Sequence, residues 1–215
     1  MRKKILTLLF FIVAAAHLIG IIIHNENLQT ITKPFLMPVL LFLYAVSVKN
    51  VNKWYVLALI FAFFGDVLLM DKENLFIVGI AAFLVTQLVY IKIITGAIGS
   101  AKISQKTIVA IPFVLFYGIL MYLLKDNLGN LMLPVLIYAA VISMFGMLAL
   151  LNFVLKRNKE ALLLAAGALI FMASDSMIAL NSFYKPQSYY NFLIMFTYII
   201  AQYLIYRFMA FDEKV

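Results

Sequence analysis

The stretch from Trp54 to Met70, WYVLALIFAFFGDVLLM, carries one carboxylate, Asp66, in an otherwise uncharged apolar run. A run of this length and composition predicts a membrane-spanning helix. Placing an ionisable side chain inside the membrane costs on the order of a few kcal/mol of free energy. Asp66 therefore indicates a functional residue that faces a bundle interior or a water-filled cavity.

The composition of the rest of the chain agrees with a membrane protein. Of 215 residues, 66% are hydrophobic and only 12% are charged, and the mean hydropathy is +1.07. With about 20 apolar residues per crossing, such a chain has room for roughly eight helices. We therefore expect a single all-α domain of eight transmembrane helices over residues 1–215, with no soluble domain.

Apolar runs mark the individual crossings. The first, Ile5–Ile23, contains an alanine triplet that resembles a signal-peptidase site, but it continues past the triplet for the length of a span, which favours a retained helix. We expect the second helix to begin at Pro34, and we place Pro34, Pro112 and Pro134 in first helical turns. The remaining predicted spans are Pro34–Val48, Trp54–Met70, Leu75–Ile94, Thr107–Leu124, Leu131–Leu155, Ala161–Leu180 and Tyr189–Met209.

Basic residues fall mainly on one side of an eight-crossing arrangement. The side of the N-terminus holds Arg2, Lys3, Lys4, Lys49, Lys53, Lys92, Lys102, Lys106, Lys156, Arg157, Lys159, Arg207 and Lys214. The other side holds Lys33, Lys72, Lys125 and Lys185. Because Lys and Arg are retained on the cytoplasmic side, this asymmetry predicts a cell-membrane protein with both termini in the cytoplasm. Scattered basic residues of this kind do not indicate nucleic-acid binding.

Asp66 has a counterpart in Asp175, which follows Ser174 in another predicted outward-running helix. Both carboxylates fall at similar depth in the outer half of the membrane. Aligning Gly65-Asp66 with Ser174-Asp175 also gives a weak four-plus-four internal repeat. Two carboxyl groups that share a low-dielectric site do not readily ionise together, so such a pair can supply one acid and one base.

Several polar side chains could complete a site around these carboxylates. Gln87 and Tyr90 are three residues apart, and Tyr198 and Gln202 are four apart, so each pair projects from one helix face. Lys33 is expected at the outer start of the second helix. Such residues also serve as hydrogen-bonding contacts between helices or as interfacial charges, and that alternative stays open.

Other membrane chemistries lack their residues. The chain has no Cys and only two His, His17 and His24, neither in a recognisable motif. An intramembrane serine protease requires a His base, and a zinc hydrolase requires about three converging ligands. We expect no metal and no other cofactor.

The ordered motifs resemble the lysoplasmalogenase-like integral membrane family, also called the YhhN family. They comprise Lys33-Pro34, Gly65-Asp66-Val67-Leu68-Leu69, Gly79 through Phe83 to Tyr90, Gly167-Ala168-Leu169-Ile170-Phe171 with Ser174-Asp175, and Tyr198 with Ala201-Gln202. The resemblance implies an eight-helix enzyme that hydrolyses the vinyl ether bond of lysoplasmalogens to a fatty aldehyde and a glycerophospho-ethanolamine or -choline.

The resemblance also implies that Asp66 and Asp175 are paired catalytic residues. The chain departs from the expected pattern at Gln87, where we expect a His in the family. If that His transfers protons, Gln87 cannot replace it. If it only orients a carboxylate or a water molecule, Gln87 can.

Vinyl ether hydrolysis needs an acid to protonate carbon and a base to activate water, as glycoside hydrolysis does. We hypothesise that Asp175 is the acid and Asp66 the base, with the reverse assignment open. Lys33 is expected to bind a carboxylate or the lipid phosphate. The remaining predicted substrate-binding residues are Gln87, Tyr90, Ser174, Tyr198 and Gln202. The expected partners are a lysophospholipid, water and membrane lipids, and the sequence leaves the oligomeric state open.

Two other functions use the same residues. A proton-coupled transporter or flippase could use both Asp residues as a relay. A non-catalytic lipid-binding protein could pair them with Lys33. The apparent depth of both Asp residues in the outer half, with no acidic step towards the cytoplasm, favours the hydrolase over the relay.

Overall fold

A computed structural model of the chain describes residues 1–211 and confirms the all-α fold with eight helices. Lys214, which entered the charge count above, lies outside the described residues, as does the side chain of Lys72. The helices are α1 Arg2–Ile22, α2 Glu26–Ala45, α3 Lys53–Leu68, α4 Lys72–Ala97, α5 Ile103–Leu124, α6 Met132–Lys156, α7 Lys159–Phe183 and α8 Tyr190–Met209. Short 3-10 turns at Lys125–Asn127 and Gly129–Leu131 connect α5 to α6.

The predicted start of the second helix at Pro34 was wrong. Helix α2 begins at Glu26, because the side chain of Asn25 caps it by accepting a hydrogen bond from the backbone N–H of Leu28. Pro34 therefore lies inside α2, and Lys33 lies about two turns into the helix instead of at its start.

Pro112 also lies inside its helix, because α5 begins at Ile103, whereas Pro134 lies in the first turn of α6 as predicted. The misplaced helix starts have a common cause. The first turns of α2 and α5 contain polar residues. A prediction based on apolar character alone assigns such residues to the preceding loop.

Helix length and composition support a multi-pass membrane protein. Seven of the eight helices in the described chain are long and apolar enough to cross a bilayer. The exception, α3, has 16 residues and rises about 24 Å, somewhat less than the roughly 30 Å of a typical hydrocarbon core. Asn52 caps its first turn through hydrogen bonds from the N–H groups of Trp54 and Tyr55.

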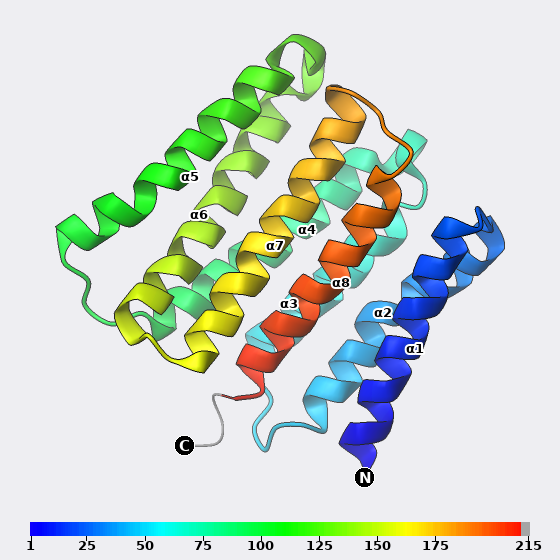
Figure 1. Cartoon of the computed structure of the whole chain (residues 1–215), viewed down its shortest axis with the longest axis horizontal. Helices are drawn as coiled ribbons and strands as arrows, with labels where there is room; N and C mark the ends of the chain where they lie inside the picture. The colour runs from blue at the N-terminus through cyan, green and yellow to red at the C-terminus, as the bar shows by residue number, and fades with distance from the viewer. Residues whose placement is uncertain (212–215) are drawn as a thin grey trace. The chain divides into compact units, whose positions relative to one another are not determined.

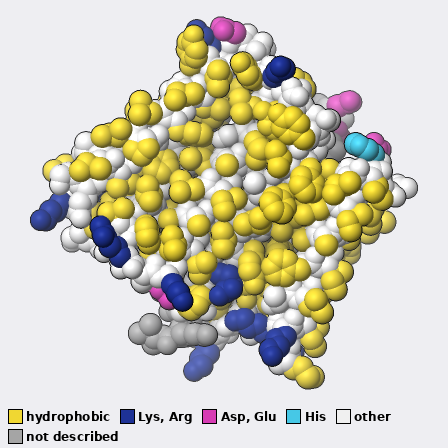
Figure 2. All heavy atoms as spheres, viewed as in Figure 1, with side chains coloured by type: hydrophobic (Ala, Val, Ile, Leu, Met, Phe, Trp, Pro, Cys, Tyr) yellow, Lys and Arg dark blue, Asp and Glu magenta, His cyan; other side chains and the backbone are white. Residues whose placement is uncertain are grey.

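The outer surface of α5 is suited to lipid contact. From Ile108 onwards its exposed side chains are almost all apolar, as expected for a surface in contact with acyl chains. Figure 2 shows hydrophobic side chains along the edge that α5 forms. The exposed apolar residues of this helix include Ile108, Ile111, Val114, Leu115, Ile119 and Tyr122.

The described chain falls into two compact units, one of residues 1–89 with 206–211 and the other of residues 90–205. In the first unit, α1 packs on α2 and α2 packs on α3. The rings of Tyr44 and Tyr55 meet edge-on, 4.6 Å apart. The N–H of Asn52 donates to the Tyr44 hydroxyl over 3.0 Å, which fixes the α2–α3 connection. Ser47 and Tyr206 share a hydrogen bond of 2.9 Å between their hydroxyl groups.

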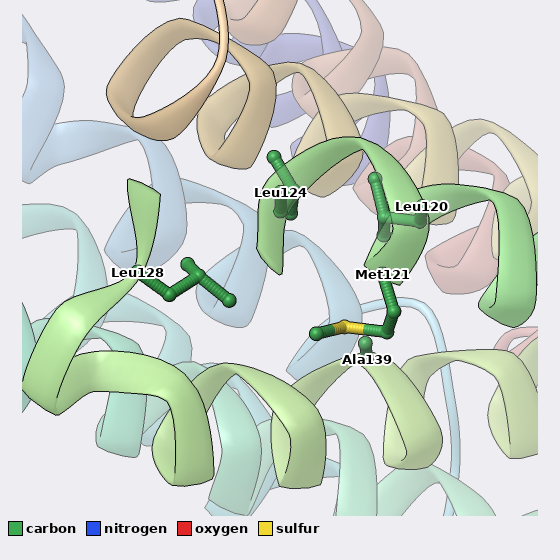
Figure 3. Packing of buried hydrophobic residues seen from close by; sticks show 5 residues of the cluster. All are labelled: Leu120, Met121, Leu124, Leu128 and Ala139. Carbon is green, nitrogen blue, oxygen red and sulfur yellow. The ribbon is translucent and has the colours of Figure 1, made fainter. Parts of the chain in front are cut away.

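In the second unit, α5, α6 and α7 lie side by side in sequence order (Figure 1). Figure 3 shows the buried cluster at one end of α5 and α6, in which Met121 lies beside Ala139; its other members are Leu120, Leu124 and Leu128. The single-domain organisation and the four-plus-four repeat stay predictions.

Candidate functional site

Asp66 is buried near the end of α3, with 2% of its surface exposed. The preceding Gly65 lets the helix that carries this carboxylate approach α4 closely. A Cβ at position 65 would lie 2.6 Å from ring atoms of Phe83 and 2.9 Å from its Cγ, which is shorter than any ordinary carbon contact. Glycine is thus required here by the neighbouring ring. The Gly-Asp pair combines close helix packing with a buried carboxylate.

Helices α3 and α4 are further joined by a polar contact. The hydroxyl of Thr86 donates to its own helix at the Ala82 carbonyl, over 3.2 Å, and lies 3.3 Å from the Ala58 carbonyl of α3. The next residue, Gln87, is fully buried. This predicted site residue therefore lies in the protein interior of the first unit and not on a lipid-facing surface.

A second polar contact in the first unit joins α1 to α2. The Nδ1 atom of His17 lies 2.9 Å from the hydroxyl of Thr32, and both side chains are buried. Because Thr32 donates its proton to the Leu28 carbonyl over 2.6 Å, its oxygen accepts from His17, which places the imidazole proton on Nδ1. Lys33, half-buried on the next position of α2, lies close enough to interact electrostatically with this imidazole.

Asp175 is buried on α7 in the second unit, with 6% of its surface exposed. The hydroxyl of Tyr138, on α6, donates a hydrogen bond to its Oδ2 atom. The adjacent Ser174 donates to the Ile194 carbonyl of α8 over 2.9 Å. Asp175 therefore lies where side-chain hydrogen bonds join α7 to α6 and to α8.

Gly167, which precedes Asp175 on α7, allows α7 and α8 to pack closely. A Cβ there would lie 2.9 Å from Ile205 Cγ1 and 3.1 Å from the Ala201 carbonyl oxygen. The close approach brings α8, with its predicted site residues, against α7. It explains in packing terms why Gly167 and Ala201 accompany the polar residues in the sequence motif.

Tyr90 and Gln202 form a buried polar pair in the second unit. The Tyr90 hydroxyl donates to Gln202 Oε1 over 2.8 Å. Gln202 is fully buried, and its Nε2 has no hydrogen-bond partner among the residues that the structure describes. A buried amide donor of this kind can bind a water molecule or a substrate oxygen.

Aromatic rings continue from Tyr90 towards α7 and α8. The Tyr90 ring stacks on Phe145 at 5.4 Å, Phe145 meets Phe171 edge-on at 6.2 Å, and Phe171 contacts Tyr198 at 5.8 Å. Tyr198 is thereby held among apolar rings one turn from Ile194. These rings form a connected aromatic cluster in the second unit.

The predicted site residues are divided between the two units. Lys33, Asp66 and Gln87 belong to the first, and Tyr90, Ser174, Asp175, Tyr198 and Gln202 belong to the second. Within the second unit the structure joins Tyr90 to Gln202 directly. The pairing of Asp66 with Asp175 stays a prediction.

Sequence reasoning missed three residues: Tyr138, His17 and Thr32. Tyr138 offered a signal, since a phenol within an apolar helix needs a hydrogen-bond partner. His17 offered a similar signal as the one imidazole inside a predicted span. Neither signal identified the partner, because partners 37 and 15 residues away are brought together only by helix packing.

Comparison with known proteins places these features in a family. A family model for the YhhN family matches residues 28–209, which is most of the chain. The chain belongs to the YhhN family. All eight predicted site residues of this family member lie in the matched range, whereas α1 and its His17 lie outside it.

Two curated relatives carry the same description. The chain is 32% identical over 152 residues to the bovine (Bos taurus) protein lysoplasmalogenase TMEM86A, covering 68% of this chain and 61% of that protein. It is 32% identical over 153 residues to the human (Homo sapiens) lysoplasmalogenase TMEM86A, with the same shares covered. The match thus spans about three-fifths of the length of these relatives. No solved structure matches this YhhN family member.

Proposed function

We propose that this protein is a membrane-embedded lipid hydrolase that cleaves the vinyl ether bond of lysoplasmalogens. The observation that carries the proposal is its similarity to two lysoplasmalogenases, together with a family match over residues 28–209 that includes both buried carboxylates. Burial of Asp66 and Asp175 in apolar helices supports it, because charged groups at membrane depth are costly and mark functional positions.

The proposed chemistry uses one carboxylic acid and one carboxylate. The acid transfers its proton to the vinyl carbon β to the ether oxygen, which leaves an oxocarbenium ion. Water then attacks the carbon attached to oxygen, and the carboxylate accepts the proton that this water loses. The resulting hemiacetal collapses to a fatty aldehyde and the glycerol hydroxyl of the head-group fragment. Asp66 and Asp175 are the proposed acid–base pair.

The other predicted residues have proposed roles in binding. Lys33 would bind the lipid phosphate or balance a carboxylate. Gln202 Nε2 is a buried donor available to water or to a glyceryl oxygen, and Tyr90 orients this amide through its hydrogen bond to Oε1. Gln87 and Tyr198 would bind water or glyceryl oxygens as well.

Ser174 has a narrower proposed role. Its proton is committed to the Ile194 carbonyl, so its hydroxyl oxygen can only accept from the substrate. We further propose that the protein lies in the cell membrane with both termini in the cytoplasm.

The test is aldehyde release from a lysoplasmalogen by purified protein in lipid nanodiscs. We expect release by the native chain and a loss of about a hundredfold to ten-thousandfold in Asp66→Asn and in Asp175→Asn, as for removal of an acid–base group. Asp126→Asn, in the exposed turn after α5, is the matched control and should keep native activity.

Two results would contradict the proposal. Folded native protein that releases no aldehyde would exclude this substrate and favour a transporter or a lipid-binding protein. Native activity in both intramembrane Asn variants would exclude the proposed pair of carboxylates.

A further inference from the structure

Tyr138 lies on α6 and was not among the predicted site residues. Its hydroxyl donates to Oδ2 of Asp175 across the α6–α7 interface (helices in Figure 1). The tyrosine is half-buried, and the carboxyl group that it contacts is buried. The contact therefore joins a phenol to a carboxyl group that is largely shielded from solvent.

The backbone around Asp175 is held in place by neighbouring contacts. The Ser174 hydroxyl donates a hydrogen bond to the Ile194 carbonyl of α8. Phe171, one turn earlier on α7, is fixed between the rings of Phe145 and Tyr198. With the backbone held on both sides, the Tyr138 hydroxyl engages Oδ2 of Asp175 and contributes to the direction in which the carboxyl group faces.

The pairing of a phenol with a carboxyl group has a chemical consequence. A phenol O–H that donates to a carboxyl oxygen favours the ionised carboxylate, because the charge strengthens the bond. A general acid must be neutral before the reaction, and a donor that favours the ionised form lowers the population of that neutral form. The geometry thus suits Asp175 to accept a proton.

We propose that Tyr138 is a positioning residue that holds Asp175 as the carboxylate base, so that Asp66 is the acid. This proposal rests on the proposed function and reverses the assignment hypothesised from sequence. In the reaction, the neutral Asp66 carboxyl transfers its proton to the vinyl carbon. Water forms the new C–O bond and gives one proton to the Asp175 carboxylate. As the hemiacetal collapses, Asp175 releases that proton and Asp66 takes one up, which restores both groups.

The first test is infrared difference spectroscopy on folded protein without substrate. Subtracting the spectrum of Asp175→Asn from that of the native protein should reveal a carboxylate band, which assigns Asp175 as ionised at neutral pH. In Tyr138→Phe that band should weaken and a carboxylic-acid band should appear. Tyr122→Phe is the matched control, because it removes the hydroxyl of an exposed tyrosine on α5.

The second test is steady-state hydrolysis of lysoplasmalogen. Loss of a hydrogen bond to a charged group should lower kcat of Tyr138→Phe by about tenfold to a hundredfold. KM should change by less than about twofold, since Tyr138 is not proposed to touch the lipid. Tyr122→Phe should match the native protein, and both phenylalanine variants should remain folded at the assay temperature.

The two tests fail separately. An acid band for Asp175 in the native protein, or an unchanged carboxylate band in Tyr138→Phe, overturns the role of Tyr138 even if the protein hydrolyses lysoplasmalogen. Equal kcat losses in Tyr138→Phe and Tyr122→Phe overturn it as well. If the native protein releases no aldehyde, the proposed function fails, while the infrared result still decides whether Tyr138 holds Asp175 as a carboxylate.

Discussion

Replacing Gly65 with alanine would push a methyl group into the ring of Phe83. The new Cβ would lie 2.6 Å from Cδ2 and Cε2 and 2.9 Å from Cγ, whereas carbon atoms pack at about 3.5–4.0 Å. Rotation of the ring about its own axis moves Cδ2 and Cε2 but leaves Cγ in place. The clash is therefore relieved only if Phe83 shifts as a whole or α3 moves away from α4.

Such overpacking costs about 1–3 kcal/mol, and the better helix propensity of alanine returns about 1 kcal/mol. We expect Gly65→Ala to lower the free energy of unfolding by about 0–2 kcal/mol. Gly118→Ala on α5 is the matched control, because nothing lies within 4 Å of a Cβ there. That variant should be as stable as the native protein or slightly more stable.

The assay is equilibrium unfolding in mixed micelles, followed by fluorescence of Trp54, the single tryptophan, which lies in the first turn of α3. A double-mutant cycle sharpens the test, since in a Phe83→Ala background the added methyl group has room. Gly65→Ala should then be neutral or stabilising, with a coupling energy of about 1–3 kcal/mol. Equal effects of Gly65→Ala in both backgrounds would refute the packing argument.

Two further predictions concern a buried amide and the path of the chain. Neither amide atom of Asn152 on α6 has a hydrogen-bond partner in the described part of the chain, although the side chain is fully buried. Asn152→Leu should therefore raise the free energy of unfolding by about 1–2 kcal/mol. A lower melting temperature of this variant would show that the amide forms hydrogen bonds with a bound molecule. Because the chain has no Cys, Lys49→Cys and Lys125→Cys can each be labelled selectively with a membrane-impermeant maleimide. Labelling of only Lys125→Cys in intact cells is expected if α3 crosses the bilayer, and labelling of both or neither variant would mean that it does not.

The sequence was sufficient for the fold because apolar runs and their flanking charges determine where helices cross a membrane. It was less informative about where helices start. Asn25 and Glu26 are good helix-start residues, but in a chain scanned for apolar character they read as loop, and the start of α2 was placed at Pro34. Pro34 lies inside this helix, between the buried residues Thr32 and Leu36.

The candidate site was predicted in part for a similar reason. Asp66 and Asp175 were visible as single charges in apolar runs. Tyr138 was not, because a tyrosine in a membrane helix is chemically ordinary until its partner is known. The contact with Asp175 depends on how α6 rotates against α7, and helical periodicity within one segment does not determine that rotation.

The contacts around Asp175 have a mechanical consequence. Tyr138 ties its carboxyl group to α6, and Ser174 ties the adjacent backbone to α8, so one position connects three helices. A bilayer sets helix tilt by matching hydrophobic length to its own thickness. A change in thickness that tilts α6 against α7 would therefore shift the carboxyl group itself. For the proposed lipid hydrolase, we expect the surrounding lipids to affect turnover through membrane thickness, in addition to supplying the substrate.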